Sequence, residues 1–162
     1  MIILGGTNLI SSITGGIFRS WAEDPDISVG SDELEWAIFS AFTNDPVLCC
    51  IASGGLHNVE APSNTKYPYI VFNLPTGMKS NTFSHEKETV LVQFKIYSRR
   101  SSSVFLNSVR EQLIRVFDDT LLVLASYDTI SMRRTISIKT KDEVDEKVWI
   151  YLVQYEVELE KK

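Results

Sequence analysis

Histidine and cysteine are scarce in this chain, and their positions exclude the common metal and disulfide arrangements. The 162 residues contain two histidines, His57 and His85, and two cysteines, Cys49 and Cys50. Zinc fingers space their paired ligands two to four residues apart, and these four residues do not. The cysteines are adjacent, so in the strand that we expect at Val47–Ile51 their side chains would point to opposite faces. We therefore expect no metal site, no disulfide, and synthesis in a reducing cytoplasm.

Basic residues are fewer than acidic ones, and long apolar runs are absent. Sixteen lysines and arginines against 21 aspartates and glutamates give a net charge of −5. General nucleic-acid binding needs a basic face, so we do not expect it, although such a surface could still let DNA pass. No run approaches the roughly 20 apolar residues of a membrane span. The apolar start, Met1–Leu4, has no basic segment before it and glycines after it, so we expect no signal peptide.

The glycine motifs of this chain lack the patterns that phosphate binding and nucleophilic catalysis require. Gly5-Gly6 and Gly15-Gly16 belong to no Gly-x-x-x-x-Gly-Lys-Ser/Thr sequence, and neither pair lies between an expected strand and an expected helix. Ser53-Gly54-Gly55 is not flanked as the nucleophile elbow of a hydrolase is. The sequence therefore carries none of these signatures, and we name no catalytic residue and no cofactor.

Residues 1–30 differ in composition from the rest of the chain. Glycine, serine and threonine are frequent there, and the glycines interrupt any helical pattern. Ile17, Phe18 and Trp21 are nevertheless apolar side chains that are costly to leave in water. The segment is either a mobile tail or an N-terminal arm that orders against a neighbouring subunit, with these three residues as contacts. Residues 31–162, in a chain that is 44% hydrophobic, have the length and core of one domain.

Two segments have the apolar spacing of amphipathic helices. The first opens at Ser31, whose hydroxyl can cap it, and ends before Pro46, because the residue before a proline avoids helical angles. The second opens among Ser101–Ser103 and ends at Asp118-Asp119. Their apolar stripes are Leu34, Ala37, Ile38, Ala41 and Phe42 in the first, and Val104, Phe105, Val109, Leu113, Val116 and Phe117 in the second.

Strand patterns fill most of the remaining chain, as short apolar runs or as alternating apolar and polar residues. A further extended piece is possible at Leu56–Val59. In Thr129–Lys139 the apolar residues Ile130, Met132, Ile136 and Ile138 alternate with polar ones. The expected strands are Val47–Ile51, Tyr69–Leu74, Thr89–Tyr97, Thr129–Lys139 and Val148–Leu159.

This order of elements, αβββαββ, predicts an α+β fold. Strands outnumber helices and the last two form a hairpin, so a mainly antiparallel β-sheet with two helices packed on one face is the natural arrangement. The residues expected in its core are Leu34, Ile38, Phe42, Tyr69, Val71, Val92, Phe94, Val109, Leu113 and Ile150.

The segment Thr76–Lys87 has the composition of a long polar loop. Loops of this length in compact domains are usually functional or mobile. Met78 and Phe83 are apolar groups in a polar segment, which favours contact with a partner. We name Met78, Lys79, Phe83 and His85 as candidate contacts, with a mobile loop that touches nothing as the alternative.

Two arginine pairs, Arg99-Arg100 and Arg133-Arg134, are the densest basic positions. They either are solvated strand ends or contact an acidic surface of a partner, since they lack the interleaved aromatic residues of a nucleic-acid interface. Arg99 and Arg100 are the pair that we name as candidate contacts.

Several stretches within residues 31–162 together resemble a known family. They are the Ala61-Pro62 turn, the Tyr67–Phe72 strand that follows it, the Val90–Tyr97 strand ending in Ser98, and the closing Tyr151–Val157 strand. In this order of elements they resemble the tail-completion proteins (tail terminators, or tail-to-head joining proteins) of long-tailed bacteriophages. The arm before Ser31 is not part of this pattern.

The resemblance implies a structural virion protein without catalytic activity. Proteins of this family cap the head-proximal end of the tail tube as a homo-oligomeric ring, commonly a hexamer. They stop tube growth and form the joint to the head–tail connector or stopper protein, and DNA crosses the ring without sequence-specific binding. Function would then reside in surfaces that contact the tail tube protein, the connector and neighbouring subunits. The alternatives are another head–tail neck protein, such as a stopper or adaptor, or a small α+β ligand-binding or enzymatic domain.

Overall fold

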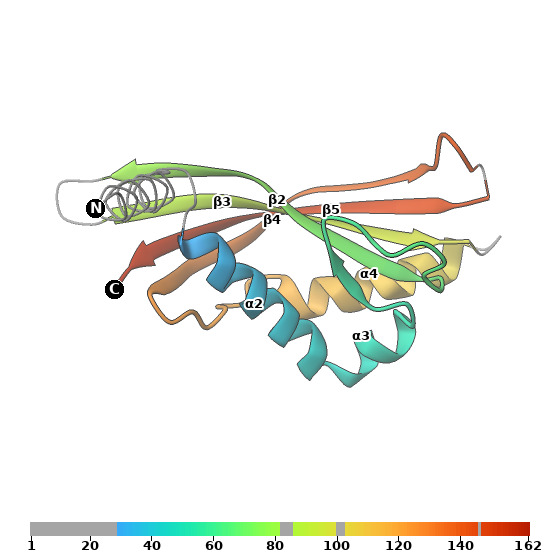
Figure 1. Cartoon of the computed structure of the whole chain (residues 1–162), viewed down its shortest axis with the longest axis horizontal. Helices are drawn as coiled ribbons and strands as arrows, with labels where there is room; N and C mark the ends of the chain where they lie inside the picture. The colour runs from blue at the N-terminus through green and yellow to red at the C-terminus, as the bar shows by residue number, and fades with distance from the viewer. Residues whose placement is uncertain (1–28, 82–85, 100–102, 146) are drawn as a thin grey trace, which may run out of the picture.

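A computed structural model describes residues 29–81, 86–99, 103–145 and 147–162 of the chain (Figure 1). These residues form three helices and one five-stranded sheet. The helices are α2 (Val29–Asn44), α3 (Pro46–Ile51) and α4 (Ser103–Phe117); the strands are β1 (Leu56–Asn58), β2 (Tyr69–Asn81), β3 (Glu86–Ser98), β4 (Tyr127–Lys141) and β5 (Trp149–Lys161).

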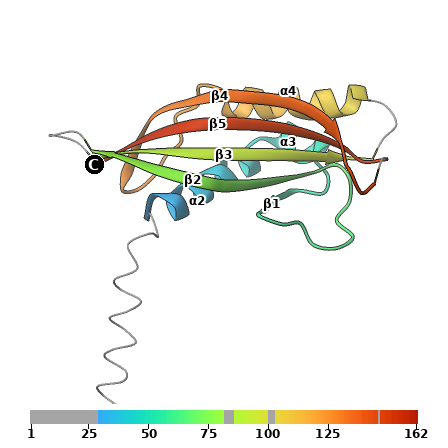
Figure 2. The same cartoon turned by 90° about the horizontal axis from the view of Figure 1, so that it is seen from above.

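The sheet has the order β1-β2-β3-β5-β4, and Figure 2 shows the strands side by side in that order. Every pairing between neighbours is antiparallel except that of β1 with β2, which is parallel. The predicted α+β class with a mainly antiparallel sheet is therefore confirmed.

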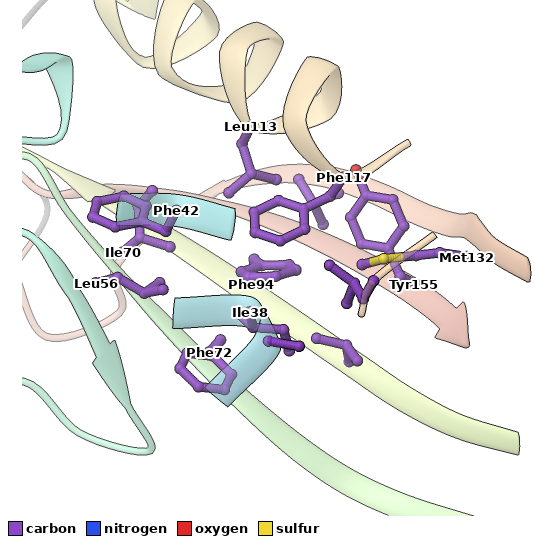
Figure 3. Close-up of a cluster of buried hydrophobic side chains, with 14 of the residues drawn as sticks. Ile38, Phe42, Leu56, Ile70, Phe72, Phe94, Leu113, Phe117, Met132 and Tyr155 are labelled. Carbon is purple, nitrogen blue, oxygen red and sulfur yellow. The ribbon is translucent and has the colours of Figure 1, made fainter. Parts of the chain in front are cut away.

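The three described helices lie on one face of the sheet, below it in Figure 1. Under them the strands present every second side chain to the core, so Val90, Val92, Phe94 and Ile96 of β3 are all buried. Aromatic rings fill the middle of this layer (Figure 3): the centroids of Phe94 and Phe117 lie 4.8 Å apart. We call this the covered face, and the other side of the sheet the open face.

Eight of the ten predicted core residues are buried, namely Leu34, Ile38, Phe42, Val71, Val92, Phe94, Val109 and Leu113. Tyr69 and Ile150 are wrong as core predictions, because both are half-buried on the open face. The sequence shows that side chains alternate between the two faces of each strand, but it does not show which of the two faces the helices cover.

The predicted strand Val47–Ile51 is a helix, α3. Asp45 caps it: its side chain accepts a hydrogen bond from the Leu48 N–H at 2.6 Å, and Pro46 occupies the first turn, where no N–H is needed. The helix-start signal of Asp45 and Pro46 therefore decides the conformation of the apolar run that follows, which had indicated a strand. The place of the missing strand is taken by β1, so the order within the described residues is ααβββαββ, with three helices there and not two.

Cys49 and Cys50 therefore diverge on a helix and not on a strand. Both are free thiols, and the Cys49 Sγ donates to the Phe42 carbonyl oxygen at 3.2 Å. The argument against a disulfide between them assumed a strand, and that premise was wrong.

The predicted loop Thr76–Lys87 is mostly a long β-hairpin. β2 continues to Asn81 and β3 begins at Glu86, and the two remain paired from Gly77–Val90 to Asn81–Glu86. β1 pairs with β2 only as far as Phe72, so the outer half of β2 is an edge strand. An edge strand need not be apolar, which is why the composition of this segment indicated a loop.

Three smaller expectations also need correction. α2 begins at Val29, so Ser31 lies inside its first turn and is not its cap. In α4 the buried stripe includes Leu106, which the sequence pattern missed, whereas Val104 is exposed. In β4, bulges after Thr129 and after Arg134 shift the alternation, so Met132 is buried while Ile138 is 54% exposed.

Candidate functional site

Three tyrosines gather at one end of the open face, where β2 begins and β3 ends. The rings of Tyr69 and Tyr97 are stacked, with centroids 4.8 Å apart and an interplanar angle of 15°. Tyr67 lies against Tyr69 with centroids 5.2 Å apart. Tyr67, Tyr69 and Tyr97 together are called the tyrosine cluster below, and they form a continuous aromatic surface on a sheet face that the described helices do not cover.

The strand register builds this cluster. Tyr69 of β2 is directly opposite Tyr97 of β3, and cross-strand pairs of this kind bring Cβ atoms to about 5 Å. Tyr67 precedes Pro68 through a cis peptide bond at the foot of β2. The loop before it turns at residues 62–65, where both the N–H and the hydroxyl of Thr65 donate to the Pro62 carbonyl oxygen. Figure 2 shows this loop at the β1 edge of the sheet.

Arg99 completes the site. Its guanidinium carbon lies 5.8 Å from the centroid of the Tyr67 ring, within the range of a cation–π contact, and it forms an ion pair with Asp145 in the β4–β5 turn. Arg99 thus ties the end of β3 to that turn. Between Arg99 and the 61–65 loop is a surface pocket of about 310 Å³ that Tyr67 and Tyr69 also line.

The environment keeps the phenols of Tyr69 and Tyr97 protonated. Burial raises the pKa of Tyr69 to about 12, with smaller contributions from Tyr67 and Tyr97. Burial, followed by the negative charge of Asp142, likewise raises the pKa of Tyr97. Neutral tyrosines with flat faces beside an arginine are suited to packing and hydrogen bonding with a protein partner, because tyrosine and arginine are enriched in protein interfaces.

Within the described ranges, no group of three or more His, Cys, Asp and Glu side chains is placed to hold a metal ion. None of the described helices is both long enough and apolar enough to cross a membrane. His57 lies in β1, as a strand residue, and its Nε2 is 2.9 Å from the Gly54 carbonyl oxygen.

The structure places few of the predicted contact residues. Arg99 is exposed and belongs to the site described above. The backbone of Met78 and Lys79 lies in the outer half of β2. The remaining predicted contacts lie outside the described residues: Ile17, Phe18, Trp21, Phe83, His85 and Arg100.

Sequence reasoning missed the tyrosine cluster as a site. Tyr69 was assigned to the core, and its partner Tyr97 lies 28 positions further along the chain, so only the register shows that they meet. Trp36 was also missed. It falls outside the apolar stripe of its helix, and that departure was a signal of an exposed aromatic residue; the side chain is 77% exposed.

No protein-family model matches this chain, and no curated protein sequence matches it. Among solved structures, the fold is similar to that of a chain from the "virion of native gene transfer agent (GTA) particle". The TM-score is 0.73 at 9% sequence identity, and the match covers 80% of this chain and 96% of that chain. At this identity the similarity establishes a shared fold.

Proposed function

We propose that this chain is a structural protein of a phage-like particle, and specifically the terminator that caps the head-proximal end of the tail tube as a homo-oligomeric ring. In this role it ends tube growth and joins the tube to the head–tail connector or stopper. It acts through surfaces and has no enzymatic activity.

The observation that carries this proposal is the shared fold with a chain of a virion. The match covers 96% of that chain, so the likeness extends over a whole virion component and not over a fragment. The resemblance of residues 31–162 to tail-completion proteins rests on separate evidence, the motifs of the sequence. Both lead to a phage-like particle, and the sequence resemblance supplies the position in the tail.

The sheet offers two different free edges, which a ring needs. A closed ring is built from heterologous contacts, in which each subunit uses two complementary patches. Within the described residues, β4 from Arg133 to Lys141 pairs only with β5, and β2 from Asn73 onward pairs only with β3. These edges lie on opposite sides of the sheet, and each can contact the next subunit.

The tyrosine cluster supplies a contact to a different protein. It is rigid, because Tyr69 and Tyr97 are stacked across two paired strands, and it is held to the β4–β5 turn by Arg99 and Asp145. Rigid aromatic residues lose little conformational entropy on binding. We assign this end of the open face to the tail tube protein or the connector.

The charge of the chain is compatible with passage of DNA. With a net charge of −5, a ring of such subunits repels the phosphate backbone overall and binds it weakly. DNA would then cross the ring without sequence-specific contacts.

The direct test is assembly on tail tubes. Tubes are prepared from particles made without this protein, and purified full-length protein is added. Electron microscopy should show caps on one end of each tube, and mass measurement should show one ring of subunits per tube. One or two copies per tail, or caps at both ends, would contradict the proposal.

A variant with Tyr69→Ala and Tyr97→Ala provides the matched control. It should still form rings while it binds tubes or connectors more weakly, because Tyr69 and Tyr97 lie outside both proposed ring edges, β4 from Arg133 to Lys141 and β2 from Asn73 onward.

A further inference from the structure

A second exposed surface lies on the helical side of the molecule, between α2 and the 121–126 segment that joins α4 to β4. It is an open groove of about 390 Å³. Its walls are mainly apolar, and its lining residues are Glu33, Trp36, Ala37, Ser40, Val123, Leu124 and Ala125.

Trp36 and Val123 make this groove unusual. Trp36 is 77% exposed and Val123 is 91% exposed. The four lining positions of α2 are spaced i, i+3, i+4 and i+7, so they form one face of the helix beside the face that enters the core. Trp36 and Val123 line the same groove and leave apolar area in water, which typically marks a site where another chain binds.

The far wall of the groove is held in place by polar contacts. The Ser126 hydroxyl and N–H donate to the two carboxylate oxygens of Glu33, at 2.6 and 2.8 Å. The Lys162 ammonium donates to the carbonyl oxygens of Leu124 and Ala125 at 2.8 and 3.3 Å. The groove is thus preformed, and one acidic and one basic group stand at its rim.

We propose that this groove binds residues 17–21 of the N-terminal segment of a neighbouring copy, with Phe18 packed between Trp36 and Val123. This inference rests on the ring proposed above. It adds to that ring the contact that locks each subunit to the next.

The composition of the segment matches the groove. Ile17, Phe18 and Trp21 provide apolar side chains for the groove, and Arg19 among them carries a positive charge that complements the Glu33 carboxylate at the rim. The residues that join this segment to α2 also give it reach. Trp21 lies eight positions before Val29, and eight extended residues span at most about 29 Å.

A neighbouring copy fits better than the same chain. The link from Trp21 to α2 contains Glu23, Asp24 and Asp26. If it folded back onto its own groove, these acids would lie along the first turns of α2, against Asp32 and Glu33. A segment that crosses to the next subunit avoids this repulsion. It also supplies the donor and acceptor patches of a heterologous contact.

The test uses photo-crosslinking in full-length protein. One version carries a benzoylphenylalanine at position 123, and a second keeps Val123 and carries Thr14→Ser as a mass tag in the tryptic peptide that ends at Arg19. The two are mixed in equal amounts, at high concentration and on tail tubes, and are irradiated. The expected product joins position 123 to this peptide, with tagged and untagged forms in about equal yield.

Other outcomes overturn the inference. Untagged product alone would mean that the segment folds back on its own chain. Products at other sites, or no product, would mean that the groove does not bind it. If rings form in these cases, only this inference fails. If no ring forms in solution or on tubes, the proposed function fails as well.

Matched variants locate the contact. Trp36→Ala should lower the mixed crosslink about tenfold or more, as loss of an aromatic anchor does. Val144→Ala, at a valine that is 95% exposed in the β4–β5 turn and outside the groove, should leave it unchanged. Neither substitution should lower the melting temperature by more than a surface change does, because both side chains are exposed in the isolated subunit.

Discussion

The two faces of the sheet use the same strands for opposite purposes. On β3, Phe94 is fully buried under the helices, whereas the next residue, Lys95, stands on the open face. On β5, Tyr155 is buried, whereas the adjacent Gln154 is bonded across the open face to Gln93 at 2.8 Å. Neighbouring residues in the chain therefore belong to a core and to a surface that remains available to partners.

The contrast between the covered face and the open face separates the residues that stabilise the fold from those available to bind partners. The covered face gains free energy from burial, and that gain does not depend on any partner. The open face and the groove beside α2 keep aromatic groups at the surface, where they contribute little until another chain covers them. Substitutions on the two sides should therefore have different kinds of effect.

The largest expected effect is from Phe94→Ala on the covered face. It should lower the free energy of unfolding by about 3–5 kcal/mol, through lost burial and the cavity left among Phe72, Phe117 and Tyr155. The matched change Lys95→Ala should stay within about 0.5 kcal/mol. Urea unfolding of both proteins measures the difference. Equal losses would show that both faces of β3 are buried in the folded protein.

The next effect is expected from Tyr155→Phe, which removes only a hydroxyl from the covered face. The Tyr155 hydroxyl donates to the Asp118 carboxylate at 2.7 Å, and Arg134 pairs with the same carboxylate at 3.2 Å. Loss of a hydrogen bond to a charged group should cost about 1.5–3 kcal/mol. The control is Tyr97→Phe on the open face, which should be nearly neutral by the same measurement. A larger loss from the control would mean that the open face carries stability too.

Gly54→Ala should affect the base of the tyrosine cluster. A Cβ at this position would come within 1.9 Å of the Lys66 carbonyl oxygen and 2.8 Å of the Tyr69 Cβ, so the backbone must shift. Overpacking of this kind typically costs about 1–3 kcal/mol. Ser53→Ala, at the exposed neighbouring residue, should change stability by less than about 0.5 kcal/mol. Thermal unfolding compares them, and equal melting temperatures would show that the contact is not tight in solution.

The smallest effect concerns pH and the groove. The hydrogen bonds from Ser126, first from its hydroxyl and then from its N–H, hold the pKa of Glu33 below its ordinary value of 4.5. A lowered folded-state pKa means that this carboxylate stabilises the fold above pH 4.5 and that the contribution is lost as the pH falls through the folded value.

Urea midpoints measured between about pH 7 and pH 3 check this prediction. Glu33→Gln should show a shallower decline at acid pH than the natural chain, whereas Glu111→Gln on the exposed side of α4 should decline in parallel with it. A parallel decline of all three proteins would remove Glu33 as an anchor of the 121–126 segment.

Much of the fold follows from local pattern. The alternation in Thr89–Tyr97 and the spacing of Val109 and Leu113 predict a half-buried strand and an amphipathic helix, and both are confirmed. These signals are local, because burial of one face requires a side-chain period of about 2 or 3.6 wherever the element lies. The α+β class could therefore be predicted from the sequence.

The sequence by itself determined which side chains are apolar and recur at helix or strand spacing. The tertiary structure decided which helices and strands contact one another. Asp45 shows the difference at α3: besides capping the helix, it accepts hydrogen bonds from Gln112 of α4 at 3.1 and 3.2 Å. The tyrosine cluster depends on the register of Tyr69 with Tyr97, and the groove depends on Glu33 meeting a residue 93 positions away. Such contacts leave no local pattern, because they join segments that only the packed core brings together.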